Sequence, residues 1–299
     1  MTLFPESYKP AIAHSIFSDK DLMAYVGAEY NLSIVNCQLV KPLVSTTYVV
    51  STPENNYILR IYPHDQPSSV ISSEMAALLF LHQKGIRVSV PHPNTDGDYL
   101  TPITAPEGER LMTLTSYAEG IPLTRVENEA YFREFGRFVG SFHKLMDDQT
   151  GSFSIRSLDK TVLIEQPLTY IAKYYSRHID ELQFLNKTAE TILRELDQYS
   201  SKELHYGFCH GDLNCSNVHV SPNGSLTLFD FEYCEIGWQA YDLGIAVSLR
   251  HQHRHGNFAR RGRPDRASHQ RRGCAVFAGH GAHSQRSRQS RSLEEAQPG

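Results

Sequence analysis

The stretch Cys209–Gly244, CHGDLNCSNVHVSPNGSLTLFDFEYCEIGWQAYDLG, contains the residues that decide the fold and the chemistry. It places an aspartate, Asp212, in a polar loop and an asparagine, Asn217, five residues later. Two short apolar runs joined by a Pro-Asn-Gly turn predict a β-hairpin that ends at a second aspartate, Asp230. Because a hairpin returns the chain close to its start, we expect these three oxygen-bearing side chains to converge.

The residue types in this stretch match a site for a metal ion and a phosphate. Asp and Asn oxygens suit a hard cation such as Mg²⁺, which keeps several waters and bridges substrate phosphates. The remaining carboxylate is then free to orient a hydroxyl and accept its proton, and phosphoryl transfer depends mostly on such positioning and charge neutralisation. The same residue types are common in ordinary loops, but the joint spacing around an apolar hairpin favours the metal–phosphate site.

The motifs H-G-D-L-N-x-x-N, F-D-F-E and Y-D-L-G resemble those of the aminoglycoside phosphotransferase and choline kinase group of small-molecule kinases, over about residues 20–249. The resemblance implies an α+β, two-lobed protein-kinase-like fold, with an antiparallel sheet and a helix in the N-lobe and a mostly helical C-lobe. It also implies an enzyme that uses ATP and Mg²⁺ to phosphorylate a small-molecule hydroxyl, on an amino alcohol, a homoserine-like metabolite or an aminoglycoside.

This resemblance assigns roles to the residues of the quoted stretch. Asp212 would be the catalytic base, while Asn217 and Asp230 would hold Mg²⁺. His210 would brace the catalytic loop without taking part in the chemistry. Asp242 would order that loop rather than bind substrate.

Two positions differ from protein kinases. Glu232 stands where protein kinases carry the glycine of D-F-G, and it is either a second metal contact or a solvent-facing residue. Gly211 replaces the arginine of H-R-D, which in protein kinases grips a phosphorylated activation loop. Asp230 and Asp242 are only twelve residues apart, which leaves little room for an activation segment. These differences favour a small-molecule acceptor.

The N-terminal half contains the residues that the resemblance implies for nucleotide binding. Arg60 lies where this fold keeps a basic residue for the nucleotide phosphates, and Glu74 would be its ion-pair partner. The alternative for these two residues is ordinary surface charge. The resemblance also implies a phosphate-covering loop with Ser45, Thr46 and Tyr48, although this loop lacks the glycines of G-x-G-x-x-G. It further implies an adenine-binding hinge at Thr115 and Tyr117.

Apolar periodicity and turn residues predict the secondary structure. The expected elements are strands at 34–41, 47–51 and 57–62, a helix at 69–84, and helical stretches at 128–146 and 168–199. The change from strands to helices places a lobe boundary near residue 117. Residues 1–117 would form the nucleotide-binding N-lobe, and residues 118–249 would form the C-lobe with the catalytic loop and the metal-binding hairpin.

Residues 250–299 differ in composition from the rest of the chain. They contain 11 Arg, no Lys and three acidic residues, so their net charge is +8 and that of residues 1–249 is −12, within a total of −4. The tail is open to four interpretations: a nucleic-acid-binding tail, a metal site at HQHRH, a disordered extension, or translation out of frame. The abrupt change after a well-patterned segment favours out-of-frame translation.

The family continues beyond Y-D-L-G into further C-lobe helices, which this tail would replace. The alternative function is therefore a nucleotide-binding protein with impaired catalysis. In that case, apolar surface that those helices would cover is expected to be exposed.

Composition excludes several other classes. An acidic body argues against a nucleic-acid surface there, and the longest apolar run, Ala76–Leu81, is too short for a membrane span. No secretory signal is visible in the first residues, and the sequence contains no P-loop motif and no G-x-S-x-G elbow. Five cysteines without a C-x-x-C pair indicate reduced thiols and a cytoplasmic enzyme. The expected partner is a small molecule, and the sequence carries no signal of oligomeric state.

Overall fold

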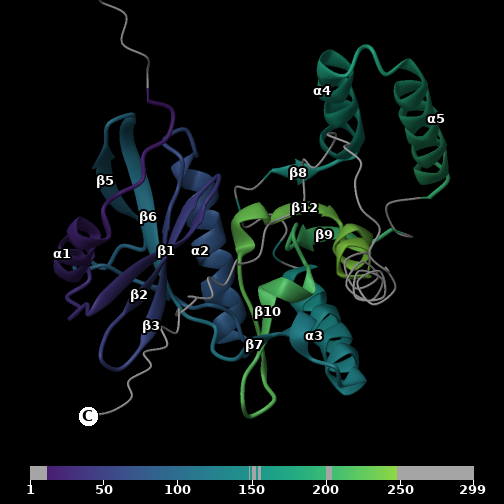
Figure 1. Cartoon of the computed structure of the whole chain (residues 1–299). Coiled ribbons are helices and arrows are strands. Elements are labelled where there is room, and N and C mark those ends of the chain that lie inside the picture. The colour runs from purple at the N-terminus through teal and green to yellow at the C-terminus, as the bar shows by residue number, and fades with distance from the viewer. Residues whose placement is uncertain (1–11, 148, 150–152, 154–155, 200–203, 248–299) are drawn as a thin grey trace, which may run out of the picture.

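The computed structural model describes residues 12–147, 149, 153, 156–199 and 204–247 (Figure 1). The tail at 250–299, with its four interpretations, lies outside these residues. The described chain forms a strand-rich N-terminal lobe and a second lobe of helices and short strands, which is the expected α+β architecture.

The N-terminal lobe is an antiparallel sheet with two helices. Its strands are β1 (Asn36–Pro42), β2 (Thr46–Ser51), β3 (Asn56–Ile61), β4 (Pro91–His92), β5 (Thr101–Ala105) and β6 (Gly108–Ser116). Their order is β1-β2-β3-β6-β4, and β5 also pairs with β6. Helix α1 (Asp19–Glu29) precedes the sheet, and α2 (Ser68–Gln83) is inserted between β3 and β4. The three predicted strands and the predicted helix at 69–84 are confirmed to within two residues.

Alternation along the strands gives the sheet two different faces. On β3, Leu59 and Ile61 are buried and pack with Leu22 and Val26 of α1 in one apolar cluster. Arg60 lies between these two residues in the strand, so its side chain points to the opposite face of the sheet. That face meets α2 and the second lobe.

The second lobe consists of one long helix, short strands and a helical pair. Helix α3 (Glu129–Asp147) matches the predicted helix at 128–146. One sheet joins β7 (Ile121–Pro122), β10 (Val218–Val220) and β11 (Leu226–Leu228), and another joins β8 (Ser157–Leu158), β9 (Tyr206–Cys209) and β12 (Glu235–Trp238). The predicted hairpin is confirmed as β10 paired antiparallel with β11. Residues 239–247 are helical.

The main apolar core crosses the lobe boundary predicted near residue 117. The six-stranded sheet ends at Ser116, yet α2 contributes Met75, Leu78 and Leu81 to the same cluster as Phe142 of α3. Helix α2 therefore comes from the first half of the sequence, but it packs in the core of the second lobe. This shared core holds the two lobes against each other.

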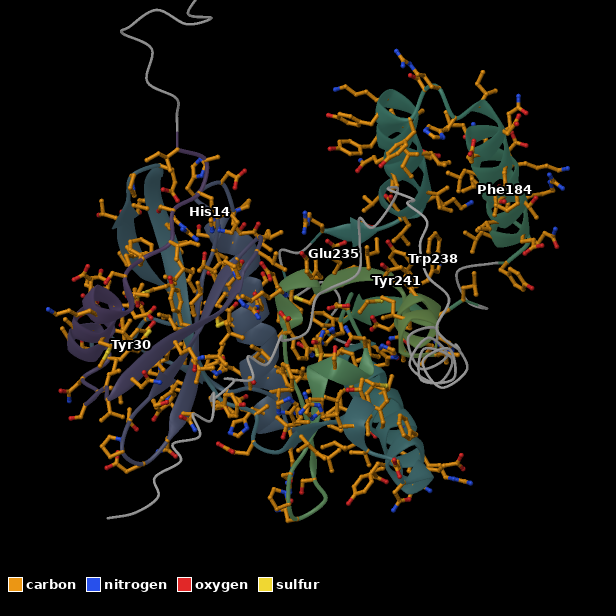
Figure 2. All side chains as sticks on the ribbon, viewed as in Figure 1. His14, Tyr30, Phe184, Glu235, Trp238 and Tyr241 are labelled. Atoms are coloured by element: carbon orange, nitrogen blue, oxygen red, sulfur yellow. The ribbon has the colours of Figure 1, made fainter. Side chains whose placement is uncertain are left out.

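Helices α4 (Gln166–Tyr174) and α5 (Ile179–Leu196) stand apart from the rest of the second lobe (Figure 1). They divide the predicted helical stretch at 168–199 in two. No residue of α4 is buried, and only Ala189 of α5 is. Phe184 on α5 is 68% exposed (Figure 2). The other large apolar side chains exposed on this pair are Tyr170, Tyr174, Ile179 and Ile192.

Within the described residues, no helix is long and apolar enough to cross a membrane.

Within the described residues, the exposed apolar side chains of α4 and α5 predict limited solubility. Replacing Phe184 with Glu should raise the soluble fraction on expression roughly twofold, because it removes the most exposed apolar side chain of the pair. Soluble and pelleted protein after lysis would be compared by gel densitometry. Asn186→Glu adds the same charge on the same helix without removing apolar surface. An equal gain from both variants would show that charge, and not the apolar face, limits solubility.

Candidate active site

The carboxylate of Asp242 anchors the loop that carries Asp212. Asp242 is fully buried, and it accepts hydrogen bonds from the backbone N–H of His210 at 2.8 Å and of Gly211 at 2.9 Å. Its Oδ2 also lies 2.9 Å from Nε2 of His143 on α3. The role expected for Asp242, ordering the loop, agrees with these contacts. His143 completes the anchor, and no motif in the sequence marked it.

His210 connects this loop to the hairpin that ends at Asp230. Its Nδ1 accepts the backbone N–H of Asp212 at 3.2 Å, and its Nε2 lies 3.0 Å from the carbonyl oxygen of Phe229. Since Nδ1 accepts a hydrogen bond, Nε2 carries the proton that is donated to Phe229. The ring also packs 4.5 Å from that of Phe231. These contacts support the bracing role expected for His210.

Gly211 has a structural reason to be glycine. Its φ is +80°, a conformation that side-chain-bearing residues rarely adopt. A Cβ at this position would lie 1.9 Å from the carbonyl oxygen of Tyr233. The backbone therefore approaches too closely for the arginine that protein kinases carry here.

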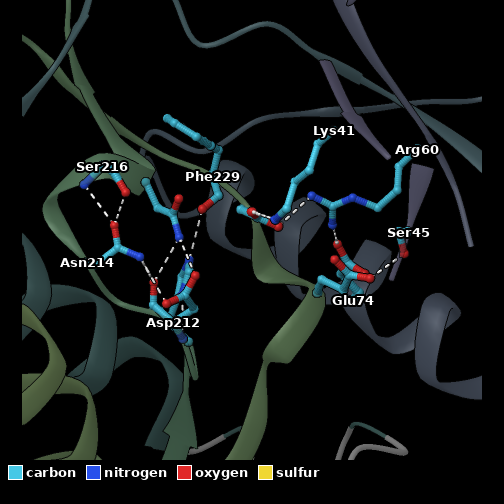
Figure 3. A network of polar contacts seen from close by, with 12 residues as sticks. Lys41, Ser45, Arg60, Glu74, Asp212, Asn214, Ser216 and Phe229 are labelled. Carbon is cyan, nitrogen blue, oxygen red and sulfur yellow. Dashed lines mark hydrogen bonds and ion pairs between the residues drawn. The ribbon is translucent and has the colours of Figure 1, made fainter. Parts of the chain in front are cut away.

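Two amide side chains orient the carboxylate of Asp212 (Figure 3). Nδ2 of Asn214 donates to Oδ1 at 2.9 Å, and Nδ2 of Asn217 donates to Oδ2 at 2.9 Å. Asn214 is itself held as the N-cap of a short 3₁₀ turn, where it accepts the backbone N–H of Ser216 at 2.8 Å. Asn214 was not among the expected site residues, although it lies within the H-G-D-L-N motif.

Asn217 is positioned to offer an oxygen to a cation. Because its Nδ2 points to Asp212, its Oδ1 lies on the other side of the amide. The backbone carbonyl of Asn217 accepts the N–H of Phe229 at 3.1 Å. The residue before Asp230 is thereby tied to Asn217, so the structure brings together the three oxygen-bearing residues expected to converge.

Asp230 is held in its ionised form by two cations. Its Oδ1 lies 2.6 Å from Nη2 of Arg60, and its Oδ2 lies 3.7 Å from Nζ of Lys41 (Figure 3). Burial alone would raise the pKa of Asp230, but the charges of Arg60 and Lys41 outweigh it and keep the pKa below its ordinary value. Its backbone is left-handed, at φ 68° and ψ 59°. An ionised carboxylate and an amide oxygen are the donor types that Mg²⁺ prefers.

The expected ion pair between Arg60 and Glu74 is present. Nη1 of Arg60 lies 3.1 Å from Oε1 of Glu74, and the hydroxyl of Tyr62 donates to Oε2 at 2.9 Å. Glu74 is buried and the side chain of Arg60 is only 12% exposed, which excludes ordinary surface charge. The buried Nε of Arg60 has no hydrogen-bond partner among the described residues, and a phosphate oxygen would satisfy this donor.

Ser45 and Glu232 meet across the gap between the lobes. The hydroxyl of Ser45, in the turn between β1 and β2, donates to Oε1 of Glu232. The two alternatives for Glu232, metal contact or solvent-facing residue, did not include this contact. It ties the expected phosphate-covering loop to the second lobe.

The side chains of Thr46 and Tyr48 lie away from this group. Tyr48 is fully buried in the sheet's apolar cluster, and its hydroxyl donates to the carbonyl of Phe17 at 3.1 Å. The Thr46 hydroxyl lies 2.9 Å from Nε2 of His14. Because side chains alternate along a strand, it is Thr47, opposite Arg60 in the register, that shares the site face. The hydroxyls of Thr46 and Tyr48 therefore point away from the site, and nucleotide binding by the backbone of this loop stays a prediction.

The expected hinge borders a cavity between the lobes. Thr115 and Ile58 line it, together with Leu78 of α2 and the charged group of Arg60, Glu74 and Asp230. The backbone N–H groups that follow Thr115 are already bonded. Ser116 donates to the carbonyl of Val90 at 2.8 Å, and Tyr117 donates to that of Asn56 at 3.3 Å.

The burial of Glu74 predicts a pH-dependent stability. Burial raises its pKa to about 7, although Arg60 and Tyr62 oppose the shift. The folded chain thus binds the proton more tightly than the unfolded chain, so wild type loses stability as the pH rises from about 4.5 to 7. Glu74→Gln removes this loss.

Urea unfolding at pH 5 and pH 8 tests this prediction. The difference in unfolding free energy, Glu74→Gln minus wild type, should increase by about 2 kcal/mol from pH 5 to pH 8. This increase is expected even if the substitution also changes stability by a constant amount at both pH values. Glu54→Gln, in an exposed turn, is the control. Equal pH dependence of wild type and Glu74→Gln would contradict a raised pKa of Glu74.

Known proteins share this fold. The structure of the amicoumacin kinase hAmiN, in complex with AMP-PNP, Ca²⁺ and Ami, aligns with a TM-score of 0.61 at 18% identity and covers 83% of this chain and 79% of that one. A microcompartment-associated aminopropanol kinase aligns with a TM-score of 0.62 at 22% identity, covering 81% and 78%. These likenesses establish the two-lobed kinase-like fold expected from the motifs.

Sequence comparison identifies the family. The amicoumacin kinase of Bacillus subtilis (strain 168) is 26% identical over 237 residues, which are 78% of this chain and 68% of that protein. The sequence profile of the phosphotransferase enzyme family (APH) matches residues 39–279, most of the chain. The resemblance noted from H-G-D, F-D-F-E and Y-D-L-G is therefore confirmed, and the chain belongs to the phosphotransferase enzyme family, as a kinase-type enzyme.

Proposed function

We propose that this chain is an ATP- and Mg²⁺-dependent kinase that transfers the γ-phosphoryl group to a hydroxyl of a small molecule. The observation that carries the proposal is the convergence of Asp212, Asn217 and Asp230 opposite the buried pair of Arg60 and Glu74. Phosphoryl transfer needs a base, a metal site and a phosphate-binding cation in this kind of arrangement.

In this proposal Asp212 accepts the proton of the acceptor hydroxyl. The amides of Asn214 and Asn217 fix the orientation of its carboxylate, so that it need not reorganise during the reaction. Asn217 and Asp230 would hold Mg²⁺, which neutralises phosphate charge when it is bound. Arg60, kept in place by Glu74, would bind a phosphate oxygen through its unpartnered Nε.

The acceptor class rests on charge and on the relatives. The net charge of −12 on residues 1–249 favours a cationic acceptor through electrostatic steering. Similar proteins are named amicoumacin kinase and aminopropanol kinase. We therefore propose an amino alcohol, a homoserine-like metabolite or an aminoglycoside. Cys37, Cys209 and Cys234 are buried free thiols, which supports a reducing, cytoplasmic setting.

The exposed apolar faces of α4 and α5 favour a second candidate function, nucleotide binding with impaired catalysis. This candidate predicts ATP binding without turnover on any acceptor. The kinase proposal predicts ATP binding together with turnover.

Substitution of the two aspartates tests the proposal. Asp230→Ala should abolish both Mg²⁺-dependent turnover and the thermal stabilisation by Mg²⁺ and ATP, because it removes the only carboxylate among the proposed metal ligands. Asp212→Asn should keep ATP binding but lower kcat by about 10²–10⁴-fold, the usual worth of a general base. A coupled ADP-release assay over a panel of amino alcohols and aminoglycosides measures turnover, and thermal denaturation measures binding.

Asp96→Asn, in an exposed turn of the N-lobe, controls for the loss of a negative charge. Wild-type turnover by both site variants would refute the assignment of Asp212 and Asp230. A cooperative unfolding transition that does not respond to Mg²⁺ and ATP in wild type would refute the kinase proposal itself.

A further inference from the structure

Lys41 reaches the site face of the sheet because of a β-bulge. The register between β1 and β2 shifts by one residue between Leu39 and Lys41, so Val40 has no partner of its own. The shift sets Lys41 opposite Thr47, which in turn is opposite Arg60 on β3. Residues opposite each other in antiparallel strands share a face.

Without the bulge, the register would pair Lys41 with Thr46. The hydroxyl of Thr46 lies near His14 and Arg110, on the face away from the site. The single extra residue therefore decides that the ammonium group of Lys41 lies beside Arg60. Bulges often re-aim a side chain in this way next to active sites.

The two cations on Asp230 are held very differently (Figure 3). Arg60 lies 2.6 Å from Oδ1, its side chain is 12% exposed, and Glu74 holds its other nitrogen. Lys41 lies 3.7 Å from Oδ2, beyond hydrogen-bond range, and its side chain is 43% exposed. Arg60 is thus a fixed cation, whereas Lys41 is loosely held on a flexible four-carbon stem.

A metal ion on Asp230 would displace the loosely held cation first. Lys41 would then lose its counter-charge, while the nucleotide phosphates brought by the same metal would supply a new one. Strand β1 leads directly into the turn that contains Ser45, so the ammonium group is attached beside the expected phosphate-covering loop.

We propose that Lys41 is a second phosphate-binding cation of this chain, whose ammonium group moves from Asp230 to the β- and γ-phosphates of the bound nucleotide. This inference rests on the proposed kinase function. It differs from a structural role, in which Lys41 only neutralises Asp230, because a structural role gives no preference among nucleotides of different phosphate number.

Nucleotide affinities in the presence of Mg²⁺ distinguish the two roles. Isothermal titration calorimetry would compare AMP with the ATP analogue AMP-PNP. Lys41→Met keeps the length of the stem without its charge. It should weaken AMP-PNP binding about tenfold, which corresponds to about 1.4 kcal/mol, because it removes a charge-assisted hydrogen bond to phosphate. AMP has neither a β- nor a γ-phosphate, so its affinity should stay within about twofold of wild type.

Three further variants complete the test. Lys41→Arg retains the charge and should restore AMP-PNP binding. Lys41→Gln is a second neutral variant that should reproduce the effect if Lys41→Met fails to unfold cooperatively. Lys20→Met removes the same charge from the exposed surface of α1 and should change neither affinity.

Equal weakening of AMP and AMP-PNP, or no change in either, would overturn the phosphate role of Lys41. Either result leaves the proposed kinase function standing, because wild type still binds the nucleotides. Failure of wild type to bind AMP-PNP would instead overturn the proposed function and this inference with it.

Discussion

The geometry of the candidate site depends on the buried carboxylate of Asp242. A buried carboxylate is costly unless its oxygens accept hydrogen bonds, and here the donors are the backbone N–H groups of His210 and Gly211. The left-handed turn at Gly211 follows from this arrangement, since both N–H groups must point at one side chain. The loop then presents Asp212 to its two orienting amides. Loss of the Asp242 carboxylate would therefore free the whole loop, rather than remove one isolated contact.

A second constraint is the buried charge of Arg60, which lies between two carboxylates. Burial and neighbouring charges move the two pKa values in opposite directions: that of Glu74 rises to about 7, and that of Asp230 falls below its ordinary value. When their environments move the pKa values of two neighbouring carboxyl groups apart, the two groups commonly have different roles. Glu74 holds Arg60 in place, while Asp230 stays ionised, as the proposed metal site would require.

The two lobes are held together by a core that does not follow the order of the chain. Helix α2 contributes Glu74 to the charged group on its polar side and Met75, Leu78 and Leu81 to the core shared with α3. The same helix thereby fixes the distance between the sheet and the second lobe. The uncovered pair α4 and α5 contrasts with it, because no comparable packing buries its apolar side chains within the described part of the chain.

Local patterns in the sequence were enough to predict several elements and the chemistry of the central motif. The strands at 34–41, 47–51 and 57–62, the helices at 69–84 and 128–146 and the hairpin were predicted within a few residues, because apolar periodicity and turn residues are local properties. The spacing of Asp212, Asn217 and Asp230 around that hairpin likewise predicted their convergence. The pairing of Arg60 with Glu74 came from the family resemblance, and the structure added that both side chains are largely shielded from solvent.

Other features were decided only by the tertiary structure. The side chains of Thr46 and Tyr48 turned to the far face, and a bulge at Val40 brought Lys41 to the near one, because register depends on pairing between strands. Anchoring by His143 depends on a contact between residues 99 positions apart. Such long-range contacts leave no local pattern in the sequence, since the fold creates them only when distant elements pack together.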